Sequence, residues 1–500
     1  MNTQAVNKPI IWSIAGSDCS GGAGIQADNQ VIQAFDGFAC NIISCVTAQN
    51  SEGVIATNPV SAKVFESQLQ ALLAEYPPAV IKLGALPNEA LIDCLIKVLE
   101  LPALSHVAVV CDPVLFATAG GEAMGNEQGL LRLMPYLSLL TPNQQEFQRL
   151  FSTMFAAPAD TPELLEQQAL SVAKQYQMDI VITGGESLLS GRLEHASAKD
   201  CCVINGEVFW LSSSVIETNA SHGTGCSFAS AIAAALACDY VALDAVVLAK
   251  AYINKALQSA QIINSSAKKL ALNHAGFPDQ LAFLPRFSRS ADELSCEFPV
   301  ITEHSLGPYP VVDSIEWLEK CLQQGIKTLQ LRMKDKTDAE MDAVIAKAAA
   351  LGRQYQARLF INDYWRLAIK HQAYGIHLGQ EDLDIADIEV IAQSGLHLGV
   401  STHSWYEIAR AHSLKPSYIA IGPIYDTPTK DMPFAPQGLQ QLQQWVELIG
   451  KNYPVVAIGG IDLSNAAEVL ASGVGSVAMV RAVTEAPDYK QAIADFQAMF

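Results

Sequence analysis

The sequence predicts an α/β protein with two domains, the second of which is a closed (β/α)8 barrel. The chain has 500 residues, and a single core usually stops growing at roughly 250–300 residues. Half of the residues are hydrophobic (50%), and short β-rich runs alternate with helical patterns from end to end. Eight such runs fall within about 200 residues of the second half, which matches the strand number and size of a (β/α)8 barrel.

Charge and cysteine content exclude several classes of function. With 31 Lys and Arg against 51 Asp and Glu, the net charge is −20, so we expect no binding to nucleic acid or to anionic membranes. Eleven cysteines without zinc-ligand spacing suit a reducing cytoplasm. Met1–Pro9 has no signal-peptide pattern, and the apolar run Phe228–Cys238 is too short to cross a bilayer. We therefore expect a soluble cytoplasmic protein, and a homo-oligomer is compatible with the sequence.

In the first half, β-rich runs predict six strands followed by a hairpin. The predicted strands are Ile10–Ser17, Asn41–Ala48, Val80–Gly84, Val107–Asp112, Leu139–Thr141 and Asp179–Thr183, and the hairpin strands are Cys201–Ile204 and Glu207–Leu211. The hairpin turns at Asn205 and Gly206, a dipeptide that accepts the left-handed conformations of a two-residue turn. Thr161 followed by Pro162 predicts the start of a helix.

A linker and eight further strands are predicted in the second half. Periodicity is lost over His274–Cys296, which predicts a linker at 276–296 between domains over 1–275 and 297–500. The expected barrel strands are Pro299–Thr302, Thr328–Arg332, Leu359–Asn362, Gly375–Leu378, Leu398–Ser401, Tyr418–Gly422, Val455–Gly459 and Ser476–Val480. Arg, Lys, Asp and Gly recur at the C-terminal ends of these strands, where such barrels carry their chemistry.

Three motifs of the first half are typical of phosphate handling. Gly16–Gly24 follows the first strand and lets the backbone approach a ligand, although many glycine-rich turns only reverse the chain. His222–Ser227 opens a helix, whose free amides suit charge on a transferring phosphate. Cys226 at this helix start is expected to have a lowered pKa and to act as a base, the alternative being an inert core cysteine. Asn143 and Glu146 suit a hydrated Mg²⁺ or, alternatively, a plain helix cap.

Together these segments resemble the hydroxymethylpyrimidine/phosphomethylpyrimidine kinase family of the ribokinase-like superfamily, over about residues 10–270. The most specific pieces are AGSDCSGGAGIQAD (15–28), TAQN (47–50), CDPV (111–114), TPNQQE (141–146) and HGTGC (222–226). The resemblance implies an αβα sandwich that uses ATP. The residue roles it implies are Asp28 and Gln49 at the pyrimidine pocket, Asp112, Asn143 and Glu146 at Mg-ATP, Gly223, Thr224 and Gly225 as the anion hole, and Cys226 as the base.

Three positions of the first half depart from this family. Thr118 stands where the family usually has a Lys, Glu186 where a His is common, and Val215 where an Arg is usual. These positions concern the handling of nucleotide or phosphate.

In the second half, cations and carboxylates follow neighbouring strands. Arg332 and Lys334 end one predicted strand and suit phosphate oxygens. Asp363 and Asp382 follow the next two strands and could bind one Mg²⁺. Hydroxyls and a cation come from Thr427–Lys430, and glycines end the seventh strand, where this fold usually cradles phosphate.

This half resembles the thiamine-phosphate synthase family over about residues 298–498. The residue roles it implies are Gln330, Leu331, Arg332, Met333, Lys334 and Asn362 at a pyrimidine diphosphate, Asp363 and Asp382 at Mg²⁺, Ser401 and Lys430 at the substrate, and Thr427, Thr429, Gly460, Val480 and Arg481 at a thiazole phosphate. Glu303 replaces an Asp that usually follows strand one, and Arg481 replaces a usual Ser.

The two resemblances imply one bifunctional enzyme of thiamine biosynthesis. The first half would phosphorylate 4-amino-5-hydroxymethyl-2-methylpyrimidine and its monophosphate with ATP, and the second would join the diphosphate to thiazole phosphate. The product of one half is then the substrate of the other, which strengthens both assignments. Two alternatives stay open at this point: a pyridoxal-kinase-like half with a thiazole-tautomerase-like barrel, or a synthase barrel fused to a non-catalytic pyrimidine-binding module.

Overall fold

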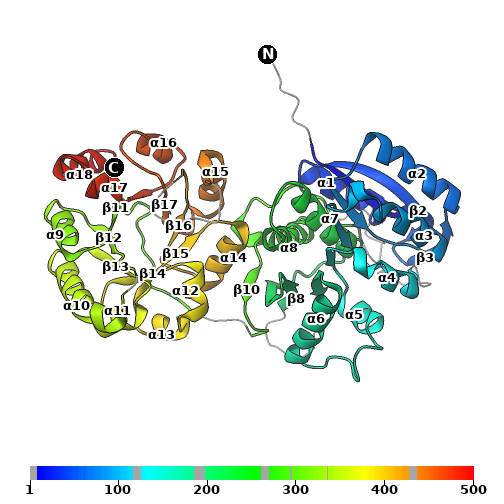
Figure 1. Cartoon of the computed structure of the whole chain (residues 1–500), viewed down its shortest axis with the longest axis horizontal. Helices are drawn as coiled ribbons and strands as arrows, with labels where there is room; N and C mark the ends of the chain where they lie inside the picture. Colours follow the sequence, from blue (N-terminus) through cyan, green and yellow to red (C-terminus); the bar gives the residue numbers. More distant parts are fainter. Residues whose placement is uncertain are drawn as a thin grey trace, which may run out of the picture. The chain divides into compact units, whose positions relative to one another are not determined.

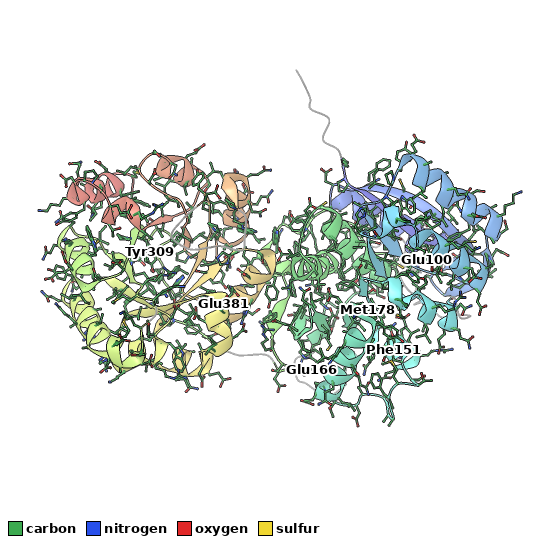
Figure 2. All side chains as sticks on the ribbon, in the orientation of Figure 1. Glu100, Phe151, Glu166, Met178, Tyr309 and Glu381 are labelled. Atoms are coloured by element: carbon green, nitrogen blue, oxygen red, sulfur yellow. The ribbon has the colours of Figure 1, made fainter. Side chains whose placement is uncertain are left out.

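The computed structural model describes residues 8–115, 125–184, 197–260, 270–292, 296–334, 336–426 and 436–500. The chain divides into two compact units, Met1–Glu293 and Leu294–Phe500, and each is described by itself. Buried side chains fill the interior of both, among them Phe151 and Met178 in the first unit and Tyr309 in the second (Figure 2).

The first unit is built on a ten-stranded sheet in the order β10-β9-β8-β7-β6-β5-β4-β1-β2-β3 (Figure 1). Its strands are β1 (Ile10–Asp18), β2 (Phe38–Asn50), β3 (Gly53–Pro59), β4 (Val80–Leu83), β5 (Ala108–Cys111), β6 (Leu139–Leu140), β7 (Asp179–Thr183), β8 (Ser197–Ile204), β9 (Glu207–Ser214) and β10 (Arg286–Ser288). Six neighbouring strands, β7-β6-β5-β4-β1-β2, pair in parallel. The hairpin strands β8 and β9 and the edge strands β10 and β3 pair antiparallel with their neighbours.

Helices cover both faces of this sheet. They are α1 (Gly24–Ala34), α2 (Ala62–Glu75), α3 (Glu89–Leu99), α4 (Glu127–Leu133), α5 (Gln144–Leu150), α6 (Pro162–Tyr176), α7 (Thr224–Ala237) and α8 (Ala242–Gln258). Side chains alternate along a strand, so Trp12 and Ile14 of β1 join the core with α2 and α3, whereas Ser13 between them bonds to Asp28 of α1. The result is the predicted αβα sandwich.

Local sequence signals of the first unit are confirmed in detail. The predicted strand Asp179–Thr183 is β7, and Thr161 caps α6 by accepting the Leu164 N–H, with Pro162 in the first turn. The hairpin turn has positive φ at both Asn205 (52°) and Gly206 (78°), as the two-residue turn requires.

The segment predicted as a linker differs from expectation. Arg286–Ser288 forms β10, which pairs antiparallel with β9 at the edge of the first sheet. Most of 276–296 therefore belongs to the first compact unit. An edge strand of three residues is too short to show the alternation of apolar and polar residues that predicts a strand. The prolines and polar residues around it therefore predicted a linker instead.

The second unit is a closed barrel of eight parallel strands, as predicted (Figure 1). Its strands are β11 (Gly307–Val312), β12 (Thr328–Leu331), β13 (Arg358–Asn362), β14 (Gly375–Leu378), β15 (His397–Thr402), β16 (Tyr418–Ile421), β17 (Val455–Ala457) and β18 (Ser476–Met479). Its helices are α9 (Ile315–Gln323), α10 (Asp338–Gln354), α11 (Trp365–Lys370), α12 (Gln380–Ile385), α13 (Ile388–Gln393), α14 (Trp405–Leu414), α15 (Gly438–Ile449), α16 (Ala466–Ala471), α17 (Arg481–Thr484) and α18 (Tyr489–Gln497).

The prediction of the first barrel strand is wrong. Pro299–Thr302 is not a strand, and β11 begins at Gly307. Two prolines in GPYPVV hide the strand signal, whereas Val300 in the predicted strand is 79% exposed. Glu303 consequently precedes the first strand rather than following it. It lies near Arg358 at the start of β13, with 3.3 Å between Oε1 and Nη1, which is the end of the barrel opposite to the strand C-termini.

Candidate active sites

Two glycine loops far apart in the sequence meet in the first unit. Gly22 and Gly223 approach so closely that a Cβ on Gly223 would lie 1.9 Å from the Gly22 carbonyl oxygen. Gly223 has φ +87° and precedes the first residue of α7. The structure thus places the two predicted phosphate-handling motifs at one point, where glycine is required both by the backbone angle and by the contact.

Asp18 organises the first of these loops. Its carboxylate accepts hydrogen bonds from the amides of Ser20 (2.7 Å) and Ala23 (2.9 Å), and it lies 3.1 Å from Nε2 of His222. Burial alone would raise its pKa, but hydrogen bonds from His222, Gln49 and Ser20 hold that pKa well below the usual range. Asp18 and His222 lie within the two motifs that the sequence predicts to handle phosphate, but no role was predicted for either residue.

Cys226 occupies the first turn of α7, but the prediction that its pKa is lowered is wrong. Desolvation of the thiol and the neighbouring negative charge of Asp112 raise the pKa of Cys226 well above its usual range, and the nearby Lys82 ammonium offsets them only in part. Asp112 also hydrogen-bonds to the Cys226 side chain. The helix dipole is a fraction of a charge, so a buried carboxylate beside the thiol outweighs it.

Asp28 and Gln49, predicted at the pyrimidine pocket, lie in different surroundings. Asp28 is fully buried; its carboxylate contacts Lys82 Nζ at 2.9 Å and accepts from Ser13 (2.6 Å) and Ser230 (2.7 Å). Gln49 lies beside the first glycine loop, because its backbone N–H and carbonyl contact the Cys19 sulfur. Lys82 was missed, although a single lysine within an apolar strand is a signal for a buried partner.

Asn143 and Glu146 form the helix cap that was the alternative reading of their motif. Asn143 Oδ1 accepts from the Glu146 amide (2.9 Å) and Glu146 Oε2 accepts from the Asn143 amide (3.0 Å). Burial and the charge of Asp112 raise the pKa of Glu146 to about 7. Asp112 and Glu146 are therefore two interacting buried carboxyl groups, and the thiol of Cys226, a partly exposed residue, lies beside Asp112 at the start of α7. Thr118 and Glu186 lie outside the described residues.

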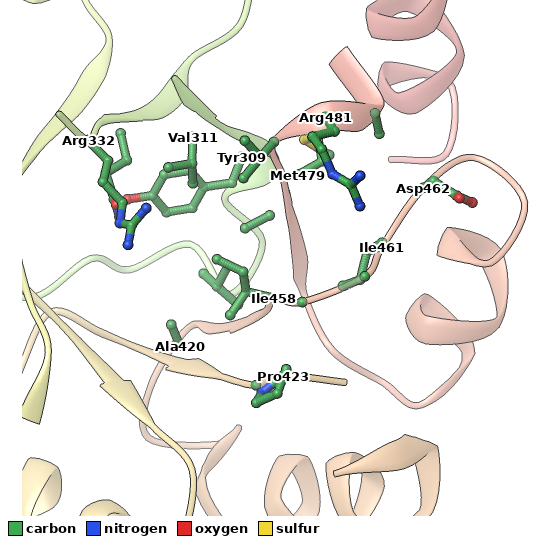
Figure 3. A pocket seen from close by; sticks show the side chains of 18 of the residues that line it. Tyr309, Val311, Arg332, Ala420, Pro423, Ile458, Ile461, Asp462, Met479 and Arg481 are labelled. Carbon is green, nitrogen blue, oxygen red and sulfur yellow. The ribbon is translucent and has the colours of Figure 1, made fainter. Parts of the chain in front are cut away.

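The barrel holds a cavity of about 1260 Å³ at the C-terminal ends of its strands. Ten predicted residues line it: Gln330, Arg332, Lys334, Asn362, Asp363, Asp382, Ser401, Gly460, Val480 and Arg481. Leu331 and Met333, which alternate with these cations, are not among the described residues that line it. Thr427, Thr429 and Lys430 lie outside the described residues. In Figure 3, Arg332 and Arg481 lie on different sides of the cavity, with Ile458 between them.

Asp363 and Asp382 form a carboxylate pair on the cavity wall. Burial, the charge of Asp382 and a hydrogen bond with it raise the pKa of Asp363 to about 7, against the opposing effect of Lys334 and Arg332. Asp382 also accepts from the Gly379 amide at 3.2 Å. Two close carboxylates share a proton when no cation is bound, and hard oxygen ligands of this kind are those Mg²⁺ prefers. The donor set therefore fits the predicted ion. Among the described residues, no group of three or more ligating side chains occurs.

Two glycines after β17 shape the far wall of the cavity. Gly459 and Gly460 both have positive φ (103° and 66°). A Cβ on Gly459 would lie 2.6 Å from Pro423, and one on Gly460 would lie 2.7 Å from Tyr425. Asn465 Nδ2 holds the Gly460 carbonyl at 2.9 Å. The predicted phosphate cradle is thus a place where only glycine fits.

A buried polar chain inside the barrel was not predicted. His377 lies 2.8 Å from Ser401 Oγ and 2.7 Å from Tyr418 Oη, and Tyr418 lies 2.7 Å from Tyr309 Oη. Burial and the nearby Arg332 cation lower the pKa of His377 to about 3, so its imidazole is neutral. His377 lies near the C-terminal end of a predicted strand, and this position indicates a candidate site residue. Tyr309 and Tyr418 fit the apolar pattern of their strands, so the sequence predicts only core positions for them.

Geometry defines the class of each unit. The first is a phosphotransferase of ribokinase-like fold, with two glycine loops meeting at a helix start; the second is a barrel transferase that gathers cations, a carboxylate pair and a glycine cradle in one cavity. Residues 18–271 match the family model described as phosphomethylpyrimidine kinase, which is just over half of the chain, and residues 300–483 match thiamine monophosphate synthase. The chain belongs to both families, one in each unit.

Two curated proteins and one solved structure are among those to which the chain is similar. The thiamine-phosphate synthase of Cronobacter sakazakii is 61% identical over 189 residues, 38% of this chain and 90% of that protein. The one from Salmonella typhimurium is 57% identical over 203 residues, 41% of this chain and 95% of that protein. A solved structure of pyridoxal kinase from Staphylococcus aureus with pyridoxal is 26% identical, with a TM-score of 0.47, and covers 54% of this chain and 95% of that one.

The predicted bifunctional enzyme is thereby confirmed: a kinase and a synthase of thiamine biosynthesis in one chain. The tautomerase-like barrel and the non-catalytic first half are not supported, because the family matches are to a synthase and to a pyrimidine kinase. Within the described residues, no helix has the length and apolar character needed to cross a membrane.

Proposed function

We propose that the first unit uses ATP to phosphorylate hydroxymethylpyrimidine and then its monophosphate, and that the second unit joins the resulting diphosphate to thiazole phosphate. The observation that carries this proposal is the barrel cavity, in which Arg332, Lys334 and the Asp363–Asp382 pair lie opposite the Gly459-Gly460 cradle. Cations and metal-binding carboxylates suit a diphosphate, and the cradle suits a second, phosphorylated substrate.

In the first unit, the amides of Gly223, Thr224 and Gly225 would hold the transferring phosphate. The start of a 14-residue helix supplies these amides, and a preorganised set of donors is the largest contribution to this kind of transfer. Asp112, Asn143 and Glu146 would organise Mg-ATP. Cys226 would receive the proton of the substrate hydroxyl while its own thiol proton moves to Asp112, the group to which it is hydrogen-bonded.

In the second unit, Asp363 and Asp382 would hold Mg²⁺, which supplies charge neutralisation to the leaving pyrophosphate. Arg332 and Lys334 would bind the same oxygens. The amino group of the pyrimidine is conjugated with the exocyclic methylene carbon, so loss of pyrophosphate leaves a stabilised cation that the cavity shields from water. The thiazole nitrogen attacks this carbon, and no general base is needed for that bond.

The proposal is tested with the purified full-length chain. ATP, Mg²⁺, hydroxymethylpyrimidine and thiazole phosphate should together yield thiamine phosphate and pyrophosphate, detected by liquid chromatography. Supplying the pyrimidine diphosphate without ATP isolates the second step. Product in the second assay alone would contradict the kinase part, and product in neither would contradict the synthase part. ATP-dependent formation of the pyrimidine diphosphate, measured in the same mixture, tests the kinase part by itself. Cytoplasmic location and homo-oligomerisation remain predictions from the sequence.

A further inference from the structure

A buried arginine of the barrel takes no direct part in the reaction proposed above. Arg410 lies on α14 and is 7% exposed. Neither this residue nor Asp384, its ion-pair partner, is among the described residues that line the cavity. A guanidinium group is rarely buried without partners, since its desolvation is unfavourable. The contacts of this side chain therefore indicate its purpose.

The partners of Arg410 lie on α12, one turn apart. Nη1 donates to the backbone carbonyl of Gln380 (3.1 Å) and to its side-chain oxygen (3.4 Å), and Nη2 pairs with Asp384. The planar fork of an arginine holds two groups in a fixed arrangement, which the ammonium of a lysine on its flexible stem does not. Gln380 Nε2 in turn donates to the Ser401 carbonyl of β15 (2.7 Å). Arg410 thus clamps one turn of α12, and that turn is also tied to the barrel wall.

Apolar packing does little to fix the position of α12. Among its six residues only Leu383 is buried, and Ile385 at its end is 76% exposed. A short helix normally gains its stability and position from a buried apolar face. The hydrogen bonds and the ion pair of the clamp take over this task here.

Asp382 lies midway between the two clamped residues in the sequence. Positions four apart share one face of a helix, whereas a position two residues on points about 200° away. Asp382 lines the cavity, and its carboxylate accepts from the Gly379 amide at 3.2 Å. A Cβ on Gly379 would lie 3.0 Å from Asp382 Oδ2, so this glycine leaves the space that the carboxylate occupies. The turn that Arg410 holds is thus the one that presents Asp382 to the cavity.

We propose that Arg410 is a positioning residue for the metal site of the barrel, because it fixes the turn of α12 that brings Asp382 to Asp363. Mg²⁺ demands a near-ideal arrangement of its oxygen ligands, so a carboxylate that shifts binds the ion less tightly. The inference rests on the proposed function of the second unit. It adds to that function a side chain that touches neither substrate nor metal.

The test replaces Arg410 by lysine, which keeps the charge and loses the fork. Mg²⁺ binding to the full-length chain is measured by titration calorimetry, and the heat that disappears in Asp363→Asn is assigned to the barrel. Arg410→Lys should weaken this binding about tenfold, as loss of a partner that orients a metal ligand does. The apparent KM for Mg²⁺ should rise by the same factor. The kcat at saturating Mg²⁺ and the KM for thiazole phosphate should stay within about twofold.

Arg358→Lys is the matched control. Arg358 is a partly buried arginine of the same barrel, and its Nη1 lies 3.3 Å from Glu303 Oε1, at the end opposite to the cavity. It should leave Mg²⁺ binding unchanged. Unchanged Mg²⁺ affinity in Arg410→Lys would overturn the proposal, as would an equal loss in Arg358→Lys or an equal rise in the KM for thiazole phosphate.

A second pair of variants decides the question if thermal unfolding shows that Arg410→Lys does not fold. The Asp384 side chain is 39% exposed, so Asp384→Asn and Asp384→Glu leave the core intact. Both disturb the clamp, and both should weaken Mg²⁺ binding about threefold, since a partly exposed ion pair contributes little. A loss in Asp384→Asn alone would indicate an effect of charge and overturn the proposal. A wild-type chain without any Asp363-dependent heat would refute the metal site itself, and this proposal with it.

Discussion

Protonation of Asp363 should control Mg²⁺ binding in the barrel. A carboxyl group binds Mg²⁺ only after losing its proton, and the pKa of this group lies at about 7 because of burial and the charge of Asp382. Because the pKa of Asp363 is raised, the affinity of the barrel for Mg²⁺ is full above pH 7 and is lost as the pH falls through 7. One proton competing at this pKa weakens the apparent Mg²⁺ affinity about tenfold between pH 8 and pH 6.

Titration calorimetry of the full-length chain measures this effect. Mg²⁺ binding is followed at pH 6, 7 and 8 in buffers of different ionisation heat, and Asp363→Asn identifies the signal that belongs to the barrel. Release of about one proton per ion is expected at pH 6 and little at pH 8. Asp382→Asn should weaken binding and flatten its pH dependence, because the charge that raises the pKa of Asp363 is gone.

Asp342→Asn is the control, since this carboxylate of α10 pairs with Lys370 at the end of α11 at 2.7 Å and does not line the cavity. Equal affinity at pH 6 and pH 8 would refute the reasoning. So would an unchanged tenfold dependence in Asp382→Asn.

Three further predictions concern the first unit and its boundary. Cys226→Ala, which removes the group that passes the proton to Asp112, should lower the kinase kcat by about 10²-fold, the lower end of general-base catalysis, and spare the synthase; near-normal kcat from pH 6 to 9 would show that Cys226 only packs. Lys82→Met should lower the free energy of unfolding by about 3–5 kcal/mol in denaturant titrations, because it leaves the buried carboxylate of Asp28 unpaired. The control Arg132→Met, which breaks the half-exposed pair with Asp93, should lower it by less than about 1 kcal/mol. A fragment ending near Asp292 should be more stable than one ending near Gly276, because only the longer one contains β10; equal stability by circular dichroism melting would contradict this.

Local sequence signals were sufficient for most of the fold. Buried parallel strands are continuous apolar runs, and turns and helix starts use residues with specific backbone preferences, so β7, the Asn205-Gly206 turn and the Thr161 cap follow directly. The first barrel strand could not be predicted in this way. Pro308 and Pro310 lack the backbone N–H groups that a strand uses for pairing, so their presence argues against a strand. Pairing with β18 holds both prolines in the sheet, whereas β12 pairs with β11 only at Val311 and Val312. This long-range pairing cannot be seen in a local window of sequence.

The role of a site residue could be predicted where a single motif contains it. It could be predicted much less well where the site is formed by residues from distant parts of the chain. The lining of the barrel cavity by Arg332, Lys334 and Asp363 follows from their places after strands. The raised pKa of Cys226 depends on desolvation of the thiol and on the charge of Asp112, which is 114 positions away and becomes its neighbour only in the fold. The buried polar chain of Ser401, His377, Tyr418 and Tyr309 likewise joins side chains from four different strands, each of which looks like ordinary core in its own segment.

The buried group around Asp28 limits how this protein can vary. Lys82, Ser13 and Ser230 come from β4, β1 and α7, and all converge on one carboxylate. Exchange of Asp28 or Lys82 alone leaves a buried charge unmatched, and exchange of either serine removes one donor to the carboxylate, so acceptable alternatives replace the charged pair together. Related chains should therefore carry either the complete set or an entirely apolar substitute. A library that randomises these four positions one at a time would sample only broken intermediates, whereas one that varies them together could find new sequences for the core of the kinase.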